Sequence, residues 1–68
     1  MQNQNSNQEK CVTEFKVSER TGMSLATLRN HRWLGKGIPY IKIGRSVRYL
    51  ESDVQNFLDQ LKVQTNPL

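Results

Sequence analysis

Apolar residues recur at helical spacing in three segments of this 68-residue chain and alternate in a fourth. The first helical segment begins at Glu14 and follows Thr13, a residue type that caps helices. Val12 and Val17 fall at the two positions that form a hydrophobic staple across a first helical turn. Gly22 is expected to end this helix, because glycine readily adopts the left-handed conformation found at helix ends.

The second helical segment repeats this arrangement. Ser24 is suited to cap a helix over residues 25–34, with Met23 and Leu28 as its staple and Gly35 at its end. The sequence between the two helices, Thr-Gly-Met-Ser, is a short turn of the kind that joins the helices of a helix-turn-helix unit. A plain helical hairpin with only a structural role has the same pattern and stays open as an alternative.

From Pro39 onward the apolar residues alternate, which predicts a two-stranded ribbon. The alternating residues are Ile41, Ile43, Val47 and Tyr49. If residues 44–46 form the loop, Lys42 and Arg48 stand opposite each other, and like charges in that position are destabilising. A polyanion lying against this charged face would offset that cost. Alternatively, both side chains extend into water.

The third helical segment begins with the spacing of a capping box, in which Ser52 would cap the helix and Gln55 would reach back to it. Its apolar stripe consists of Val54, Phe57, Leu58 and Leu61. We expect this stripe to pack against the helical hairpin and the ribbon, since an isolated ribbon is only marginally stable in water. The order helix, turn, helix, ribbon, helix predicts a small, mostly helical α+β domain.

The composition of the chain limits its organisation and chemistry. Residues 1–10 are polar and predict a disordered tail, residues 11–64 form the expected domain, and residues 65–68 are expected to fray because Pro67 cannot extend a helix. The single cysteine, Cys11, cannot form an internal disulfide, and with His31 it makes too small a ligand set for a structural metal. We therefore expect no metal or other cofactor and a reducing, cytoplasmic location. No apolar run approaches the roughly 20 residues that span a bilayer, so we expect no membrane association.

Charge is distributed unevenly along the chain. The formal net charge is +4, but residues 20–50 contain seven Lys or Arg and no Asp or Glu, with aromatic residues between the charges. This is the electrostatic pattern expected of a protein that binds a polyanion, above all nucleic acid. A solvated basic face is the alternative. A chain this short rarely holds a deep cleft, and its sequence contains no phosphate-binding loop of the Walker type. We expect neither an enzyme nor a small-molecule substrate.

Three motifs resemble one family of DNA-binding proteins. TGMSLATLRN, GKGIPYIKIGRSVRY and the Ser-Asp-Val near the start of the last helix are similar to the excisionase and AlpA-type family of small winged helix-turn-helix proteins, distant relatives of the MerR-type domain. The resemblance implies a winged helix-turn-helix fold, double-stranded DNA as partner, and a bacterial, phage or mobile-element origin. It also implies that the second helix enters the major groove and that the ribbon, or wing, contacts the neighbouring backbone or the minor groove. His31 departs from the family, as many relatives carry Trp there, and Trp33-Leu34 replaces polar residues.

A helical wheel separates the two faces of the second helix. With Leu28 facing the core, Ala26, Arg29, Asn30 and Trp33 point away from it. Arg and Asn are the side chains that read guanine and adenine, whereas Ser24 and Thr27 at the helix start suit a phosphate. Arg32 either anchors a phosphate or pairs with an acid on another helix. The expected DNA contacts are Ser24, Ala26, Thr27, Arg29, Asn30 and Arg32 on the helix, and Lys42, Arg45, Ser46 and Arg48 on the wing.

Trp33 and Leu34 lie on the outer side of the same wheel, where an apolar pair gains nothing from the core. We expect them to contact a protein, either a recombinase (integrase) or a neighbouring copy of this chain on DNA. Alternatively, Trp33 folds inward and fills space near His31. The function we favour is an excisionase that binds and bends DNA. A small transcriptional regulator and a basic adaptor for an acidic protein stay open as alternatives.

Overall fold

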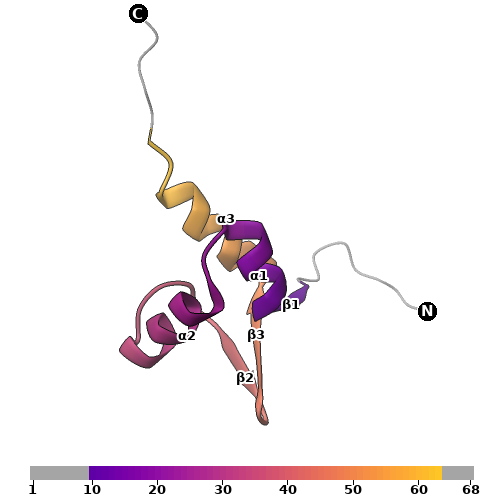
Figure 1. Ribbon diagram of the computed structural model, residues 1–68. Coiled ribbons are helices and arrows are strands. Elements are labelled where there is room, and N and C mark those ends of the chain that lie inside the picture. Colours follow the sequence, from indigo (N-terminus) through magenta and orange to yellow (C-terminus); the bar gives the residue numbers. More distant parts are fainter. Residues whose placement is uncertain (1–9, 64–68) are drawn as a thin grey trace, which may run out of the picture.

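The computed structural model describes residues 10–63, so the tail expected over residues 1–10, apart from Lys10, and the frayed end expected over residues 65–68 lie outside the described residues. The elements are β1 (Cys11–Thr13), α1 (Glu14–Thr21), α2 (Leu25–Leu34), β2 (Ile41–Ile43), β3 (Ser46–Leu50) and α3 (Glu51–Gln60). Figure 1 shows α2 beside the β2–β3 hairpin, with α3 extending away on the opposite side. The α+β class expected from the sequence is confirmed, with helices over about half of the described residues.

The first two helices form where their local signals predict. Thr13 Oγ1 accepts a hydrogen bond from the Lys16 amide at 3.2 Å, and Ser24 Oγ accepts one from the Thr27 amide at 3.1 Å. Each cap satisfies an amide that has no partner within its own helix. Both helices end at a glycine in the left-handed conformation, α1 at Gly22 and α2 at Gly35. The predicted boundaries of α1 and α2 are therefore confirmed.

The hairpin differs from the sequence-based expectation by one residue of register. Ser46 belongs to β3 and pairs with Ile43, so the loop is Gly44-Arg45 and not three residues long. The first loop residue, Gly44, has a positive φ of 61°, whereas Arg45 does not have a positive φ. A positive φ at the first loop residue alone is the φ pattern of a type II′ turn. As a result Lys42 pairs with Val47, not with Arg48. The predicted opposition of Lys42 and Arg48 was wrong, and so was the charge cost inferred from it.

The sheet has a third strand, whereas the sequence predicts only a two-stranded ribbon. β1 pairs antiparallel with β3, so that β3 is central and the order is β1-β3-β2. Val12 lies opposite Tyr49 and packs against the core from β1. Three residues are too few to show a period of two, and Val12 had been explained as a helix staple, so the strand was missed.

The last helix starts earlier than predicted. α3 begins at Glu51 and its N-cap is Leu50, which has no capping side chain, so the predicted capping box at Ser52 was wrong. The reason is that β3 runs directly into the helix: the Glu51 amide donates to the Lys10 carbonyl at 3.0 Å, beyond the last ladder pair. Lys10 thus takes part in the fold, although it had been assigned to the tail. Leu61, expected in the core, is exposed just past the helix end.

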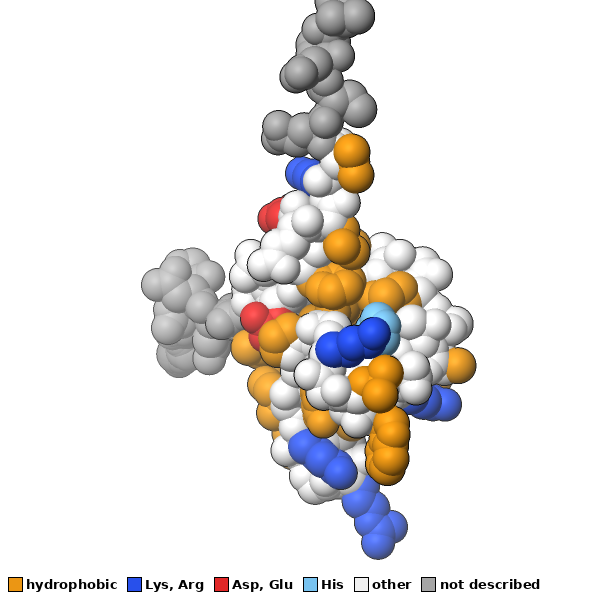
Figure 2. All heavy atoms as spheres, turned by 90° about the vertical axis from the view of Figure 1, so that its left-hand side faces the viewer, with side chains coloured by type: hydrophobic (Ala, Val, Ile, Leu, Met, Phe, Trp, Pro, Cys, Tyr) orange, Lys and Arg blue, Asp and Glu red, His pale blue; other side chains and the backbone are white. Residues whose placement is uncertain are grey.

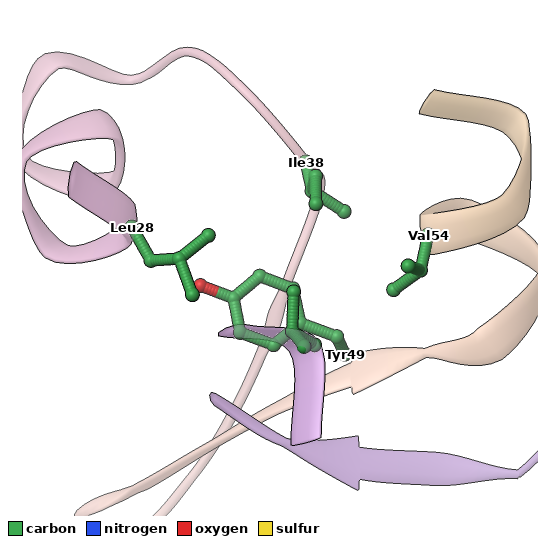
Figure 3. Packing of buried hydrophobic residues seen from close by; sticks show 5 residues of the cluster. Leu28, Ile38, Tyr49 and Val54 are labelled. Carbon is green, nitrogen blue, oxygen red and sulfur yellow. The ribbon is translucent and has the colours of Figure 1, made fainter. Parts of the chain in front are cut away.

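The core is a small cluster drawn from helices, the sheet and the loop before β2. Its fully buried members are Val17, Leu28, Ile38, Tyr49 and Val54. In Figure 3 the Tyr49 ring lies in the middle of this cluster, with its hydroxyl directed toward α2. Tyr49 therefore connects the sheet to the second helix. Within residues 10–63 no helix is long and apolar enough to cross a membrane.

Candidate nucleic-acid interface

A groove of about 340 Å³ lies between α2 and the β2–β3 hairpin, and we call it the α2–hairpin groove. Its lining residues are Arg29, Arg32, Trp33, Tyr40, Lys42, Arg45 and Val47. Four of the seven are cations and two are aromatic. Figure 2 shows the face that carries α2, with Lys and Arg side chains and apolar side chains interspersed over its lower half. The fold thus brings together basic residues that are far apart in the sequence.

Arg29 does not extend freely into this groove. Its Nε donates to Glu14 Oε1 at 3.2 Å and its Nη2 donates to Glu14 Oε2 at 2.6 Å, a two-bond contact with the first residue of α1. These hydrogen bonds from Arg29, with a smaller contribution from Arg32, hold the pKa of the Glu14 carboxyl below its usual value of 4.5 against the opposing effect of burial. Glu14 thus offsets part of the charge of the basic stretch, although it lies outside that stretch in the sequence.

Arg32 is held more tightly than Arg29. Its Nη2 donates to Glu14 Oε1 at 3.1 Å and its Nη1 donates to the Tyr49 hydroxyl at 2.6 Å. The guanidinium carbon also lies 5.7 Å from the centre of the Tyr40 ring and 6.0 Å from that of Tyr49, within cation–π range. The pairing with an acid on another helix, one of the two alternatives from the sequence, is therefore present, and the acid is Glu14 on α1. Arg32 joins α1, α2 and the sheet.

The start of α2 is exposed and carries no acid in its first turn. Besides capping the helix, the Ser24 hydroxyl donates to Thr27 Oγ1 at 3.0 Å. The remaining amides of the first turn have no carbonyl partner in the helix, and the helix dipole makes this end positive. Ala26 and Asn30 are exposed, on the outer side that the wheel predicts. These residues form an accessible edge along α2.

The expected wing residues divide between the two sides of the sheet. Because cross-strand partners point to the same face, Lys42 shares a face with Val47 and lines the α2–hairpin groove. Arg48 lies on the other face, and its Nη1 donates to the Val47 carbonyl at 2.9 Å. Ser46 and Arg48 line a separate groove beside the start of α1. Arg45, at the tip, borders both grooves.

Trp33 and Leu34 are exposed at the end of α2. The Trp33 side chain is 85 % exposed, so the alternative in which it folds into the core is wrong. Trp33 shares the α2–hairpin groove with Tyr40, a residue that sequence reasoning did not select. Tyr40 lies between two regular elements, where no periodicity marks an outward or inward position. Its proximity to Tyr49, with ring centres 6.3 Å apart, arises from the tertiary fold.

His31 supports the loop that leads into the hairpin. It is half-buried on the inner side of α2, and its Nδ1 is a buried atom without a hydrogen-bond partner among residues 10–63. A side chain added at Gly37 would come within 2.7 Å of this nitrogen, and Gly37 has φ 85°. Residue 37 is therefore best suited to glycine, because the His31 ring occupies the space that a β-carbon would fill and the backbone has a positive φ. The expectation of a core or hinge residue fits this placement.

Sequence reasoning also missed Glu14. As an acid in a first helical turn it had a sufficient local explanation, and nothing in its neighbourhood indicated two arginines fifteen and eighteen positions away. Within the described part of the chain, no three His, Cys, Asp or Glu side chains gather as a metal site requires. Comparisons with protein-family models, curated proteins and solved structures find no match to this chain.

Proposed function

We propose that this protein binds double-stranded DNA in a sequence-specific manner, as a winged helix-turn-helix protein in which α2 is the recognition helix and the β2–β3 hairpin is the wing. The observation that carries this proposal is the α2–hairpin groove, where four cations and two aromatic side chains meet. A basic surface of this kind, next to a helix whose outer edge is polar and accessible, matches the charge and shape of a DNA groove and its flanking phosphates.

The two sides of the groove have different tasks in this proposal. The outer edge of α2 presents Arg29 and Asn30, side chains that discriminate guanine and adenine by paired hydrogen bonds. Lys42 and Arg45 neutralise phosphates along the adjoining backbone, a contact that carries no sequence information. The exposed start of α2 adds amides that suit a further phosphate.

The biological role we favour is that of an excisionase, a small protein that shapes DNA for a recombinase of a mobile element. One such module covers only about 600 to 1,000 Å² on DNA, so several adjacent copies are needed for strong and selective binding. The exposed Trp33 and Leu34 supply an apolar surface for a neighbouring copy or the recombinase. Bending then follows from phosphate neutralisation on one side of the DNA.

Selection of binding sites from a random double-stranded DNA library, followed by footprinting, tests the proposed function. We expect an enriched motif and a footprint over it. The test variant is Lys42→Ala, because Lys42 lines the α2–hairpin groove. The control is Lys16→Ala, which removes the same charge from a residue paired with Glu19 on α1. Weak binding without base preference, or equal effects of the two variants, would exclude the interface and favour an adaptor for acidic proteins.

Gel shifts on DNA with one and with several copies of the selected motif test the excisionase role. Trp33→Ala should leave binding to a single site intact and reduce cooperative binding to multiple sites or to a recombinase-bound complex. A bending assay on the same fragments should show bent DNA. Straight DNA with independent binding at each site would instead favour a transcriptional regulator.

A further inference from the structure

Glu14 contacts both arginines of α2 although it belongs to α1. Its side chain is only 15 % exposed, whereas that of Arg29 is 54 % exposed. The carboxylate is thus fixed by its surroundings, and the arginine that it holds remains accessible at the edge of the α2–hairpin groove. One negative charge here faces two positive charges, so the local balance stays positive.

The geometry of the contact leaves part of Arg29 available. A guanidinium has five N–H donors in a rigid plane, and Glu14 takes one hydrogen from Nε and one from Nη2. The second Nη2 hydrogen and both Nη1 hydrogens bond to nothing else among residues 10–63. Two of these three donors, the second Nη2 hydrogen and one Nη1 hydrogen, point along the end edge of the guanidinium, and a pair of parallel donors of this kind can meet the O6 and N7 atoms of a guanine.

We propose that Glu14 is a positioning residue for DNA specificity: it holds Arg29 in the orientation that suits a base edge and offsets part of the charge that would otherwise bind phosphates of any sequence. This inference rests on the proposed function of the α2–hairpin groove. An arginine held at its Nε side cannot turn toward the nearest phosphate without giving up two hydrogen bonds. The carboxylate therefore weakens binding to random DNA more than binding to the correct site.

The other acid of α1 provides a matched control. Glu19 lies 3.3 Å from Lys16 and both side chains are largely exposed, away from the α2–hairpin groove. Glu14→Gln and Glu19→Gln change the net charge equally and keep an oxygen at nearly the same position. A difference between them therefore reports the contact with Arg29 and Arg32 and not the overall charge of the protein.

The experiment measures affinity for a selected site and for random DNA over a series of salt concentrations. For Glu14→Gln we expect binding to random DNA to strengthen about two- to fivefold, because the carboxylate no longer competes with phosphate for the accessible Arg29. The slope of log affinity against log salt should become steeper by about 0.9, the contribution of one added phosphate contact. The ratio of specific to random affinity should fall roughly threefold, whereas Glu19→Gln should change it little.

The Glu14→Asp variant distinguishes the positioning of Arg29 from the negative charge of the carboxylate. It keeps the negative charge but is one methylene shorter and cannot meet both arginines in the same way. We expect random DNA affinity and salt slope close to those of the unaltered protein, together with a weaker base preference at the position read by Arg29. Unchanged preference in this variant, or identical effects of Glu14→Gln and Glu19→Gln, would overturn the inference. Failure of the unaltered protein to prefer any sequence would instead overturn the proposed function.

Discussion

The two basic elements that border the α2–hairpin groove are held in different ways. On α2, Arg29 and Arg32 are tied to Glu14, and Arg32 is tied further to Tyr49 in the core. On the hairpin, Lys42 and Arg45 are exposed, and no ion pair involves them in the described part of the chain. The helix thus presents cations in fixed orientations, whereas the hairpin presents cations that are free to adjust.

This difference suits two kinds of contact. Hydrogen bonds to base edges require donors at defined positions, because a misplaced fork loses both of its bonds. Contacts to phosphate depend mainly on charge and distance, so an exposed side chain without an ion-pair partner is sufficient. A protein with both elements can recognise bases with one element and bind phosphates with the other.

The largest expected effect is on the free energy of unfolding, and it compares how firmly α2 and the hairpin are packed. Leu28 is 2 % exposed in the core, whereas Ile43 is 57 % exposed on the hairpin. Leu28→Ala should lower the free energy of unfolding by about 2 to 5 kcal/mol, and Ile43→Ala should change it by less than about 0.5 kcal/mol. Chemical denaturation of both variants measures this. Similar losses would show that the hairpin is anchored as firmly as the helix.

Arg32→Ala is expected to have the next largest effect on stability. It leaves the Tyr49 hydroxyl and part of the Glu14 carboxylate without their donors in a half-buried position, which should cost about 1 to 3 kcal/mol. Arg45→Ala, at the exposed hairpin tip, should change the free energy of unfolding by less than about 0.5 kcal/mol. Thermal unfolding followed by circular dichroism compares the two. An equally stable Arg32→Ala protein would contradict the role of Arg32 as a link between α2 and the sheet.

If the proposed function is correct, base preference should distinguish α2 from the hairpin. Arg29→Ala should weaken binding to the selected site about tenfold and relax the preference at one base pair. Arg45→Ala should instead weaken binding to selected and random DNA by similar factors. Fluorescence anisotropy on a panel of single-base variants of the site measures both effects. If Arg45→Ala altered the preference and Arg29→Ala did not, the tasks of helix and hairpin would be reversed.

The salt dependence of DNA binding tests which face of the hairpin contacts phosphates. Lys42 lines the groove and Arg48 lies on the opposite face of the sheet. Lys42→Ala should make the slope of log affinity against log salt shallower by about 0.9, whereas Arg48→Ala should change it by much less. Titrations at several salt concentrations provide the slopes. Equal changes would mean that DNA contacts both faces of the hairpin.

The smallest expected effect concerns the pH dependence of stability. Since the hydrogen bonds from Arg29 lower the pKa of Glu14 below 4.5 in the folded protein, this carboxylate stabilises the fold above that pH. The contribution should be lost as the pH falls through the lowered value. Glu14→Gln should therefore be less stable than the unaltered protein at pH 7, by less than about 1 kcal/mol, and the difference should vanish in acid. Melting curves between pH 7 and pH 3 measure it, with Glu19→Gln as control.

Some features of the molecule follow from short stretches of sequence. The ends of α1 and α2 are determined by Thr13, Ser24 and the glycines that follow each helix, because capping groups act on amides and carbonyls within a few residues. The outward position of Arg29 and Trp33 follows from the period of the helix once Leu28 is placed inside. Local rules were sufficient for these predictions.

Other features depend on contacts between segments that are distant in the sequence, so local patterns do not predict them. β1 and the start of α3 depend on each other, because Cys11 pairs with Leu50 and the Glu51 amide donates to the Lys10 carbonyl. The hairpin register depends on the length of the loop at Gly44. Because this loop is one residue shorter than predicted, Lys42 and Arg48 lie on opposite faces of the sheet.

The positions of the basic residues and the apolar face of the second helix could be predicted without the structure, because both follow from composition and helical period. Which cations stay free was decided only when α1 packed against α2 and placed Glu14 beside two arginines. An ion pair between segments has no signature in either one, since its energy depends on a distance that the whole fold sets.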